Sequence, residues 1–288
     1  MPSTLNFLKK HTVVVVDSGD LESIQKFSPI DATTNPSLIL AASKMPKYSK
    51  IIEEAVKIAK GKGKTLEEQI EIASEYTLVM FGIEILKIIP GRVSVEVDAR
   101  LSFDKEKQIA KALKLISLYE EMGIPKERIL IKLSSTWEGI QAAKELESKH
   151  GVHCNLTLIF AFAQAVACAE AKVTLISPFK FGYKTEVMGA SLHNVNQILG
   201  LVGCDLLTVS PNLLEELANM TEVSEVTLDV KKASSRCEYK EPLSLDEATF
   251  RWMMNEDVVA TEVLADSIRN FAVDLRTLDG VLREHLLA

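Results

Sequence analysis

The sequence predicts one α/β domain over residues 1–288, a parallel eight-stranded (β/α)8 barrel of the TIM type. Short β-branched or aliphatic runs alternate with longer amphipathic segments, which indicates parallel strands with helical crossovers. The presence of eight such runs favours a closed barrel. An open doubly wound sheet is disfavoured because no G-x-G-x-x-G follows the first run. The length agrees, since barrels of this class often run to about 250 residues undivided.

The predicted strands are the short aliphatic runs, and we expect them to pair in parallel. They are Thr12–Asp17, Pro29–Thr33, Val93–Asp98, Ile129–Ser134, Val152–Thr157, Val173–Ser177, Thr185–Gly189 and Leu206–Ser210.

Amphipathic segments between these runs predict the outer helices. They are Tyr48–Lys60, Leu66–Ile88, Lys105–Met122, Glu138–Lys149, Phe160–Glu170 and Asn194–Leu201. After Pro211 the chain becomes mainly helical and more polar, and we expect its C-terminal helices to pack on the barrel. These are Leu213–Asn219, Ser244–Asn255 and Asp257–Arg283.

Composition excludes several classes of partner. The net charge of −7 and pI near 5.4 argue against nucleic acid or an anionic membrane, although one basic pocket could still bind a small anion. The four cysteines lack C-x-x-C spacing and the five histidines do not cluster, so we do not expect structural zinc. Without an apolar leader or a membrane-length apolar run, we expect a cytoplasmic protein with free thiols.

Lysine 132 lies within the apolar strand Ile129–Ser134 (ILIKLS). Burying an unpaired ammonium group is strongly unfavourable, and a buried lysine can avoid this cost by losing its proton. The neutral amine that results is the form that attacks a carbonyl to make a Schiff base. The alternative is a strand-end lysine whose head reaches solvent.

Alternation along the strands predicts a polar lining inside the barrel. In Val93–Asp98 the valines share one parity and Ser94, Glu96 and Asp98 the other, and Lys132 likewise alternates with isoleucines. We therefore expect the polar set to point inward and the aliphatic set toward the helices. Further polar residues at or near the carboxyl ends of strands are Asp17, Asn35, Asn155, Thr157 and Ser177.

Each of these residues also has a structural interpretation. Asp17 and Asn35 could be helix caps or turn formers. Glu96 could simply pair with Lys132, although an ion pair inside a barrel is a costly way to gain stability. Thr157 and Ser177 are weak signals individually. The joint occurrence of a Lys, a Glu, an Asp, two Asn, a Thr and a Ser on one predicted lining favours a functional site.

Long ordered motifs in the chain resemble those of transaldolases, enzymes of the pentose phosphate pathway, over nearly its whole length. The matching stretches are Val16–Asp20 (VDSGD), Asp31–Ser37 (DATTNPS), Val93–Ser102 (VSVEVDARLS), Ile131–Gly139 (IKLSSTWEG), Cys154–Leu158 (CNLTL), Ser177–Phe179 (SPF), Gly189–Ser191 (GAS) and Gly203–Asp205 (GCD).

The resemblance implies a class I aldolase-type barrel, with no metal and no cofactor, that moves a dihydroxyacetone unit between sugar phosphates. Lys132 would be the Schiff-base nucleophile, Asp17 the general acid/base at the C4 hydroxyl, and Glu96 with Thr157 would position the water of imine formation and hydrolysis. The substrate-binding residues would be Asn35, Asn155, Ser177, Phe179, Ser191 and His193. Burial favours the neutral amine of Lys132 and ionised carboxylates favour the charged one, and the sequence leaves this balance open.

The chain departs from the family pattern at two places where transaldolases carry an arginine. After Phe179 only residues 180–184 precede the next strand, whereas a parallel crossover needs at least about 10–12 residues. The second arginine position holds His193. Arginine offers a bidentate fork for phosphate, so Lys180, Lys184 and His193 would compensate only in part. We also expect the short link to leave one barrel face uncovered or to reposition a strand.

The leading functional prediction is a transferase that moves dihydroxyacetone from sedoheptulose 7-phosphate or fructose 6-phosphate to an aldose phosphate. The alternative is a shortened isoform, a catalytically impaired or non-catalytic transaldolase-like binding protein. A metal-dependent aldolase is disfavoured because no histidine cluster is present. The sequence leaves open a homodimer and the preferred donor and acceptor.

Overall fold

The computed structural model describes residues 3–176, 185–221, 225–229 and 243–288. Its strands form one parallel sheet in the order β5-β4-β3-β2-β1-β7-β6. The strands are β1 (Val13–Asp17), β2 (Asp31–Thr33), β3 (Val93–Glu96), β4 (Ile129–Ser134), β5 (Cys154–Thr157), β6 (Met188–Gly189) and β7 (Leu206–Val209).

An additional parallel segment closes this sheet into a ring. Leu175 bridges Asn155 of β5 on one side and Glu186, just before β6, on the other. The backbone N–H of Leu175 donates to the Cys154 carbonyl over 3.1 Å, and the Glu186 N–H donates to the Thr174 carbonyl over 2.8 Å. Since β6 pairs with β7 and β7 with β1, eight parallel segments meet around the ring. The predicted barrel is confirmed.

Where the predicted strands can be compared, they differ from the observed ones chiefly at their ends. The predicted strand 173–177 is reduced to the bridge at Leu175, and Ser177 lies outside the described residues. The strands predicted before and after the 180–184 link, 173–177 and 185–189, are neighbours in the ring, because Leu175 pairs with Glu186. The link itself also lies outside the described residues.

The described helices are α1 (Thr4–His11), α2 (Leu21–Phe27), α3 (Pro36–Ser43), α4 (Ser49–Lys62), α5 (Leu66–Leu86), α6 (Lys105–Glu121), α7 (Trp137–Glu145), α8 (Phe162–Glu170), α9 (Val195–Leu199), α10 (Pro211–Asn219), α12 (Glu247–Glu256) and α13 (Val258–Leu287). Short turns of helix are η1 (Pro46–Tyr48), η2 (Ala99–Leu101), η3 (Lys126–Arg128) and the π-helical η4 (Leu146–His150).

Local chemistry accounts for several helix ends. The side chain of Thr65 accepts from the Glu68 N–H at the start of α5 while Glu68 reaches back, which forms a capping box. Pro36 at the start of α3 satisfies the helical φ without leaving an unpaired N–H. The helix that begins with α7 continues into η4 and ends at Gly151, whose φ of +59° favours glycine.

The two faces of the strands bury different clusters, as alternation predicted. Leu130 packs inside the ring with Val15, Leu175 and Leu206. Ile131, of the opposite parity, packs in the large core between strands and helices. Lys132 shares the parity of Leu130 and therefore lies on the inner face.

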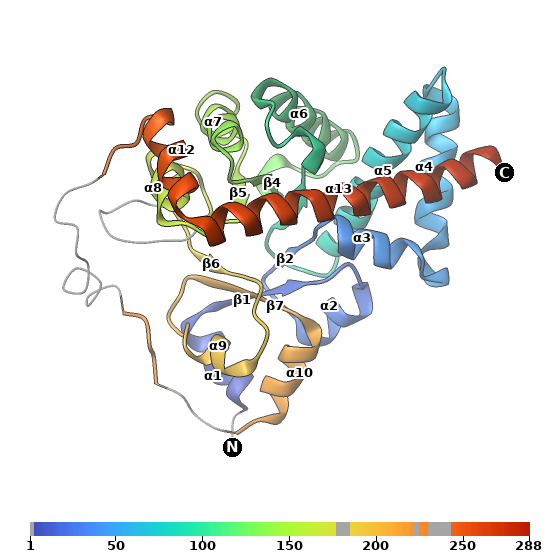
Figure 1. The fold of residues 1–288 in the computed structure, drawn as a ribbon. Coiled ribbons are helices and arrows are strands. Elements are labelled where there is room, and N and C mark those ends of the chain that lie inside the picture. The colour runs from blue at the N-terminus through green and yellow to red at the C-terminus, as the bar shows by residue number, and fades with distance from the viewer. Residues whose placement is uncertain (1–2, 177–184, 222–224, 230–242) are drawn as a thin grey trace.

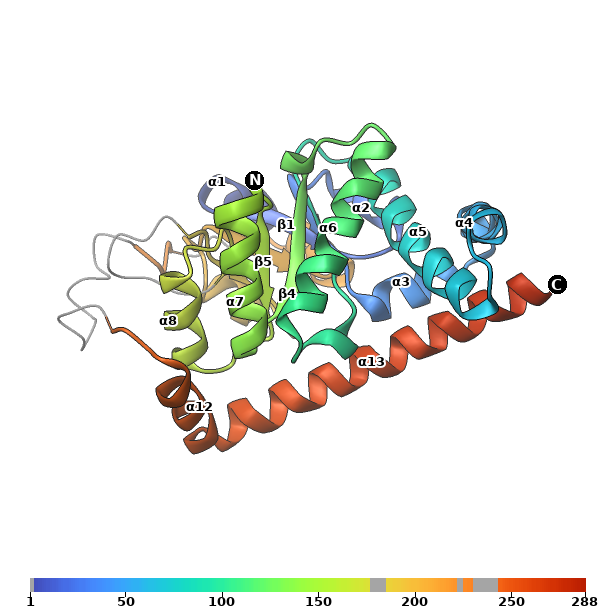
Figure 2. The same ribbon diagram turned by 90° about the horizontal axis from the view of Figure 1, so that it is seen from above.

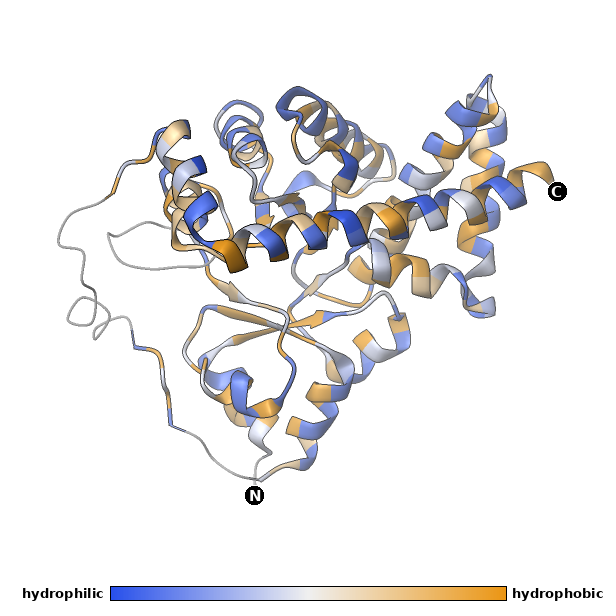
Figure 3. Cartoon of the chain, in the orientation of Figure 1, coloured by the Kyte–Doolittle hydropathy of each residue, from blue (hydrophilic) through white to orange (hydrophobic). Residues whose placement is uncertain are grey.

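The C-terminal helix α13 packs against α3, α4, α5 and η2. Figures 1 and 2 show it as one long rod that runs from α12 past the strands toward α4. Its apolar and polar residues alternate in Figure 3, and its buried face includes Ile268, Leu275 and Leu282. The large core extends from Leu5 to Ala260, so we propose one domain with the C-terminal helices packed on the barrel. None of the helices in the described part of the chain is long and apolar enough to cross a membrane.

Candidate active site

A row of polar side chains crosses three neighbouring strands inside the ring. Strand register pairs Glu96 of β3 with Lys132 of β4, and Lys132 with Asn155 of β5. Lys132 Nζ lies 3.1 Å from Glu96 Oε2 and donates to the Thr34 carbonyl over 3.2 Å. The Lys132 side chain is only 9 % exposed, so its head does not reach solvent as the structural interpretation would require.

Glu96 carries a buried carboxyl group with little support from hydrogen bonds. The contact with Lys132 is an ion pair by distance, but its geometry is not that of a hydrogen bond, and neither Glu96 oxygen accepts one from the described residues. Burial raises the pKa of Glu96, the nearby Lys132 charge lowers it, and Asp17 raises it further, with a net upward shift. The ionised form of Glu96 therefore depends chiefly on Lys132.

Asp17 is held at the end of β1 by a chain of hydroxyl groups. Thr33 Oγ1 donates to Asp17 Oδ1 over 2.7 Å and lies 2.6 Å from Thr208 Oγ1. Because Thr33 gives its only hydroxyl hydrogen to Asp17, Thr208 is the donor in the second bond. The cap of α2 is Asp20, whose side chain accepts from the Ser23 N–H, so Asp17 is not the cap.

Asn35 caps a helix and also lines the candidate site. Its Oδ1 accepts from the Leu38 N–H over 2.9 Å, which confirms the predicted helix cap at α3. Asn35 also lines the cavity that contains Lys132. The cap uses Oδ1, and Nδ2 is the part of the side chain that can donate to a ligand.

A cavity of about 540 Å³ is lined by Lys132, Asp17 and Asn35, whereas Glu96 lines a separate hollow of about 700 Å³. The predicted site residues that line the first cavity are Asp17, Asn35, Lys132, Asn155, Thr157 and Ser191. Two further walls come from Leu158, at φ +60°, and from Phe271 of α13, whose ring centroid lies 5.9 Å from Lys132 Nζ.

The structure does not bring every predicted residue to the cavity. Ser177 and Phe179 lie outside the described residues, so their roles stay predictions. His193 is exposed and is not among the described residues that line the cavity. Its backbone N–H donates to Gln197 Oε1 over 2.7 Å, and its proposed contact with phosphate also stays a prediction.

Sequence reasoning missed four residues that shape the site. Thr33 lies inside the Asp31–Ser37 motif, and Thr208 shares the inward parity of Leu206, so a signal was present for both. Gln164 is buried and binds the Phe160 and Ala161 N–H groups and the Ser135 and Leu158 carbonyls, which fixes the loop after Thr157. The sequence has no local signal for Phe271, because only the folded chain brings α13 close to Lys132.

A closed (β/α)8 barrel with a buried lysine beside a carboxyl group, at the carboxyl ends of its strands, defines a lysine-centred barrel enzyme. The sequence profile of the Transaldolase/Fructose-6-phosphate aldolase family matches residues 14–180 and 180–282. The chain is 52% identical over 320 residues to "Probable transaldolase" of Drosophila melanogaster, an alignment that covers 99% of this chain and 96% of the relative. It is 51% identical over 324 residues to "Transaldolase" of Rattus norvegicus, and 50% identical over 322 residues to that of Homo sapiens. The rat alignment covers 100% of this chain and 96% of the relative, and the human alignment covers 99% and 95%. The chain belongs to the transaldolase/fructose-6-phosphate aldolase family.

The relatives carry residues that this chain lacks. The rat alignment spans 324 residues, whereas this chain has 288. The family profile divides at residue 180, which is where the short link begins.

Proposed function

We propose that the chain is a transaldolase of the pentose phosphate pathway in the cytoplasm. It transfers a dihydroxyacetone unit from a ketose phosphate, sedoheptulose 7-phosphate or fructose 6-phosphate, to an aldose phosphate. The observation that carries the proposal is the buried Lys132 amine, 3.1 Å from Glu96 in a cavity that Asp17 and Asn155 also approach. An amine in such a position suits reversible imine chemistry without a cofactor.

Imine formation uses Lys132 and Glu96. The neutral amine of Lys132 attacks the C2 carbonyl of the donor, and the oxygen leaves as water once it has been protonated. Glu96 is within reach to accept and return the amine proton, and Thr157 lines the same cavity for positioning that water. The raised pKa of Glu96 suits proton exchange better than that of a solvated carboxylate would.

Asp17 performs the next step, cleavage of the donor. It accepts the proton of the C4 hydroxyl as the C3–C4 bond breaks, and the bond's electron pair moves into the iminium to give an enamine. An aldose phosphate leaves. The hydroxyl chain from Thr208 through Thr33 fixes the orientation of the Asp17 carboxylate for this transfer.

The enamine then forms a bond to the acceptor aldehyde carbon, and Asp17 returns the proton to the new C4 oxygen. Water hydrolyses the imine and frees the ketose product and Lys132. Asn155 Nδ2 donates to Ser94 Oγ over 3.0 Å, so its Oδ1 is oriented as an acceptor for a substrate hydroxyl. Asn35 and Ser177 are proposed to bind the other hydroxyls of the dihydroxyacetone unit.

A coupled assay with fructose 6-phosphate and erythrose 4-phosphate tests this function. We expect transfer by the chain, loss of transfer in Lys132→Ala, and unchanged transfer in Lys57→Ala, whose lysine is exposed on α4. Folded protein that binds the sugar without transfer would favour the non-catalytic alternative. Loss of activity on chelation would instead indicate a metal-dependent aldolase.

A further inference from the structure

Phe271 of α13 lies close to the amine of Lys132. Its ring centroid lies 5.9 Å from Lys132 Nζ, and the ring lines the 540 Å³ cavity. Phe271 is only partly buried and does not belong to the hydrophobic clusters formed by the described residues. Its position is therefore explained better by the cavity than by core packing.

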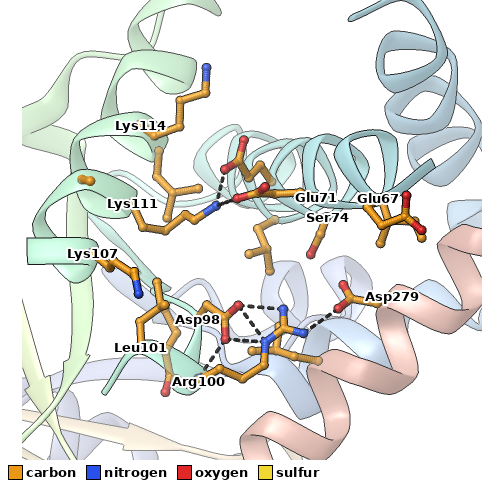
Figure 4. A pocket seen from close by; sticks show the side chains of 17 residues that line it. Glu67, Glu71, Ser74, Asp98, Arg100, Leu101, Lys107, Lys111, Lys114 and Asp279 are labelled. Carbon is orange, nitrogen blue, oxygen red and sulfur yellow. Dashed lines mark hydrogen bonds and ion pairs between the residues drawn. The ribbon is translucent and has the colours of Figure 1, made fainter. Parts of the chain in front are cut away.

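Two polar contacts fix α13 over this cavity. Ser37 Oγ of α3 donates to Asp274, one turn after Phe271. Arg100 of η2 binds Asp279 through Nη1 over 2.9 Å and also binds Asp98 over 2.7 Å. Figure 4 shows Arg100 reaching from the segment after β3 to α13, at the side of a hollow of about 700 Å³.

These anchors relate Phe271 to the catalytic strands. Ser37 follows Asn35 at the start of α3, and Arg100 follows Glu96 after the end of β3. The helix is thus attached to two segments that themselves carry site residues. A phenyl ring held in this way has neither a donor nor an acceptor, and it excludes water from one side of Lys132 Nζ.

We propose that Phe271 is a specificity-determining residue that sets how the lysine-bound enamine is partitioned between transfer and hydrolysis. This inference rests on the proposed function. In transfer, the enamine carbon bonds to an aldehyde carbon, and the aldehyde oxygen takes up a proton. In hydrolysis, the enamine carbon takes a proton from a water-derived acid instead. Water then adds to the iminium, the carbon–nitrogen bond breaks, and free dihydroxyacetone and Lys132 amine result. Phe271 disfavours the second course because it keeps water from the iminium carbon next to Lys132 Nζ.

The test measures free dihydroxyacetone and transfer product together, with fructose 6-phosphate as donor and erythrose 4-phosphate as acceptor. The variants are Phe271→Ala, which removes the ring, and Phe271→Leu, which keeps an apolar side chain. Val273→Ala is the matched control, because Val273 is exposed on the same helix. Borohydride trapping of the donor on each protein reports imine formation separately.

We expect the ratio of free dihydroxyacetone to transfer product to rise about tenfold in Phe271→Ala, with a smaller rise in Phe271→Leu and none in Val273→Ala. We also expect Arg100→Gln, which loosens α13, to raise the ratio without changing the residues at the lysine. Normal trapping with an unchanged ratio in both Phe271 variants would overturn the role of Phe271 and leave the proposed function standing. Absence of any trapped adduct in the unmodified chain would overturn both.

Discussion

Replacing Lys132 by methionine isolates the charge of the buried pair. Methionine keeps an unbranched side chain of similar length but removes the ammonium group. Glu96 is then left in a site where it is only 4 % exposed, without the cation 3.1 Å away. Breaking a buried ion pair in this way costs about 3–5 kcal/mol of the free energy of unfolding.

The loss depends on pH because Glu96 can take up a proton. Its pKa in the folded protein is already raised by burial, and it rises further when Lys132 is removed. When the pKa of a carboxyl group is higher in the folded than in the unfolded protein, protonation stabilises the folded state. This contribution to the free energy of unfolding is complete below the pKa of the unfolded state, and it is lost as pH rises through the pKa of the folded state. The loss of unfolding free energy in Lys132→Met is therefore largest at neutral and alkaline pH. It becomes smaller as the pH falls toward the ordinary pKa of glutamate, about 4.3.

Urea unfolding followed by circular dichroism, at about pH 8 and about pH 5, measures this deficit. The double variant Lys132→Met/Glu96→Gln is the control, and it should recover much of the loss because no charge remains buried. A deficit of less than about 1 kcal/mol that does not change with pH would refute the reasoning, since exposed pairs behave in that way.

Three other predictions concern catalysis, the turn after β4 and phosphate binding. Asp17→Asn should lower kcat by about 10²- to 10⁴-fold while borohydride still traps the donor on Lys132, and normal kcat would exclude Asp17 as the base. Gly139→Ala should destabilise the chain by about 1–3 kcal/mol in urea unfolding, because its Cβ would lie 2.0 Å from the Ser134 carbonyl oxygen; an unchanged midpoint would contradict this contact. The KM for fructose 6-phosphate should exceed that of the rat relative by about tenfold, because His193 stands at an expected arginine position. Equal KM values in parallel assays would mean that other groups bind the phosphate.

The inner lining of the barrel could be predicted because strand alternation is a local property of the sequence. Two short runs show that Glu96 lies on the same strand face as Ser94, and Lys132 on the same face as Leu130. The parallel register then places Glu96 beside Lys132. The cap at Asn35 was equally local, since it needs only the residues of one helix start.

The remaining parts of the site depend on contacts between distant segments. Phe271 approaches Lys132 only because α13 crosses the strands, and hydropathy along α13 does not reveal which strand it meets. The hydroxyl bond between Thr33 and Thr208 requires β2 and β7 to flank β1 in the sheet. The strand expected over 173–177 shortened to a bridge at Leu175, although its apolar composition is that of a longer strand.

Borohydride reduction in the presence of fructose 6-phosphate, followed by peptide mapping, tests the central claim most directly. A reduced adduct on Lys132 blocks tryptic cleavage there, so the account predicts a labelled peptide that begins at Ile129 and reads through to Lys144. Transfer activity with no adduct, or with the adduct on a different lysine, would contradict it.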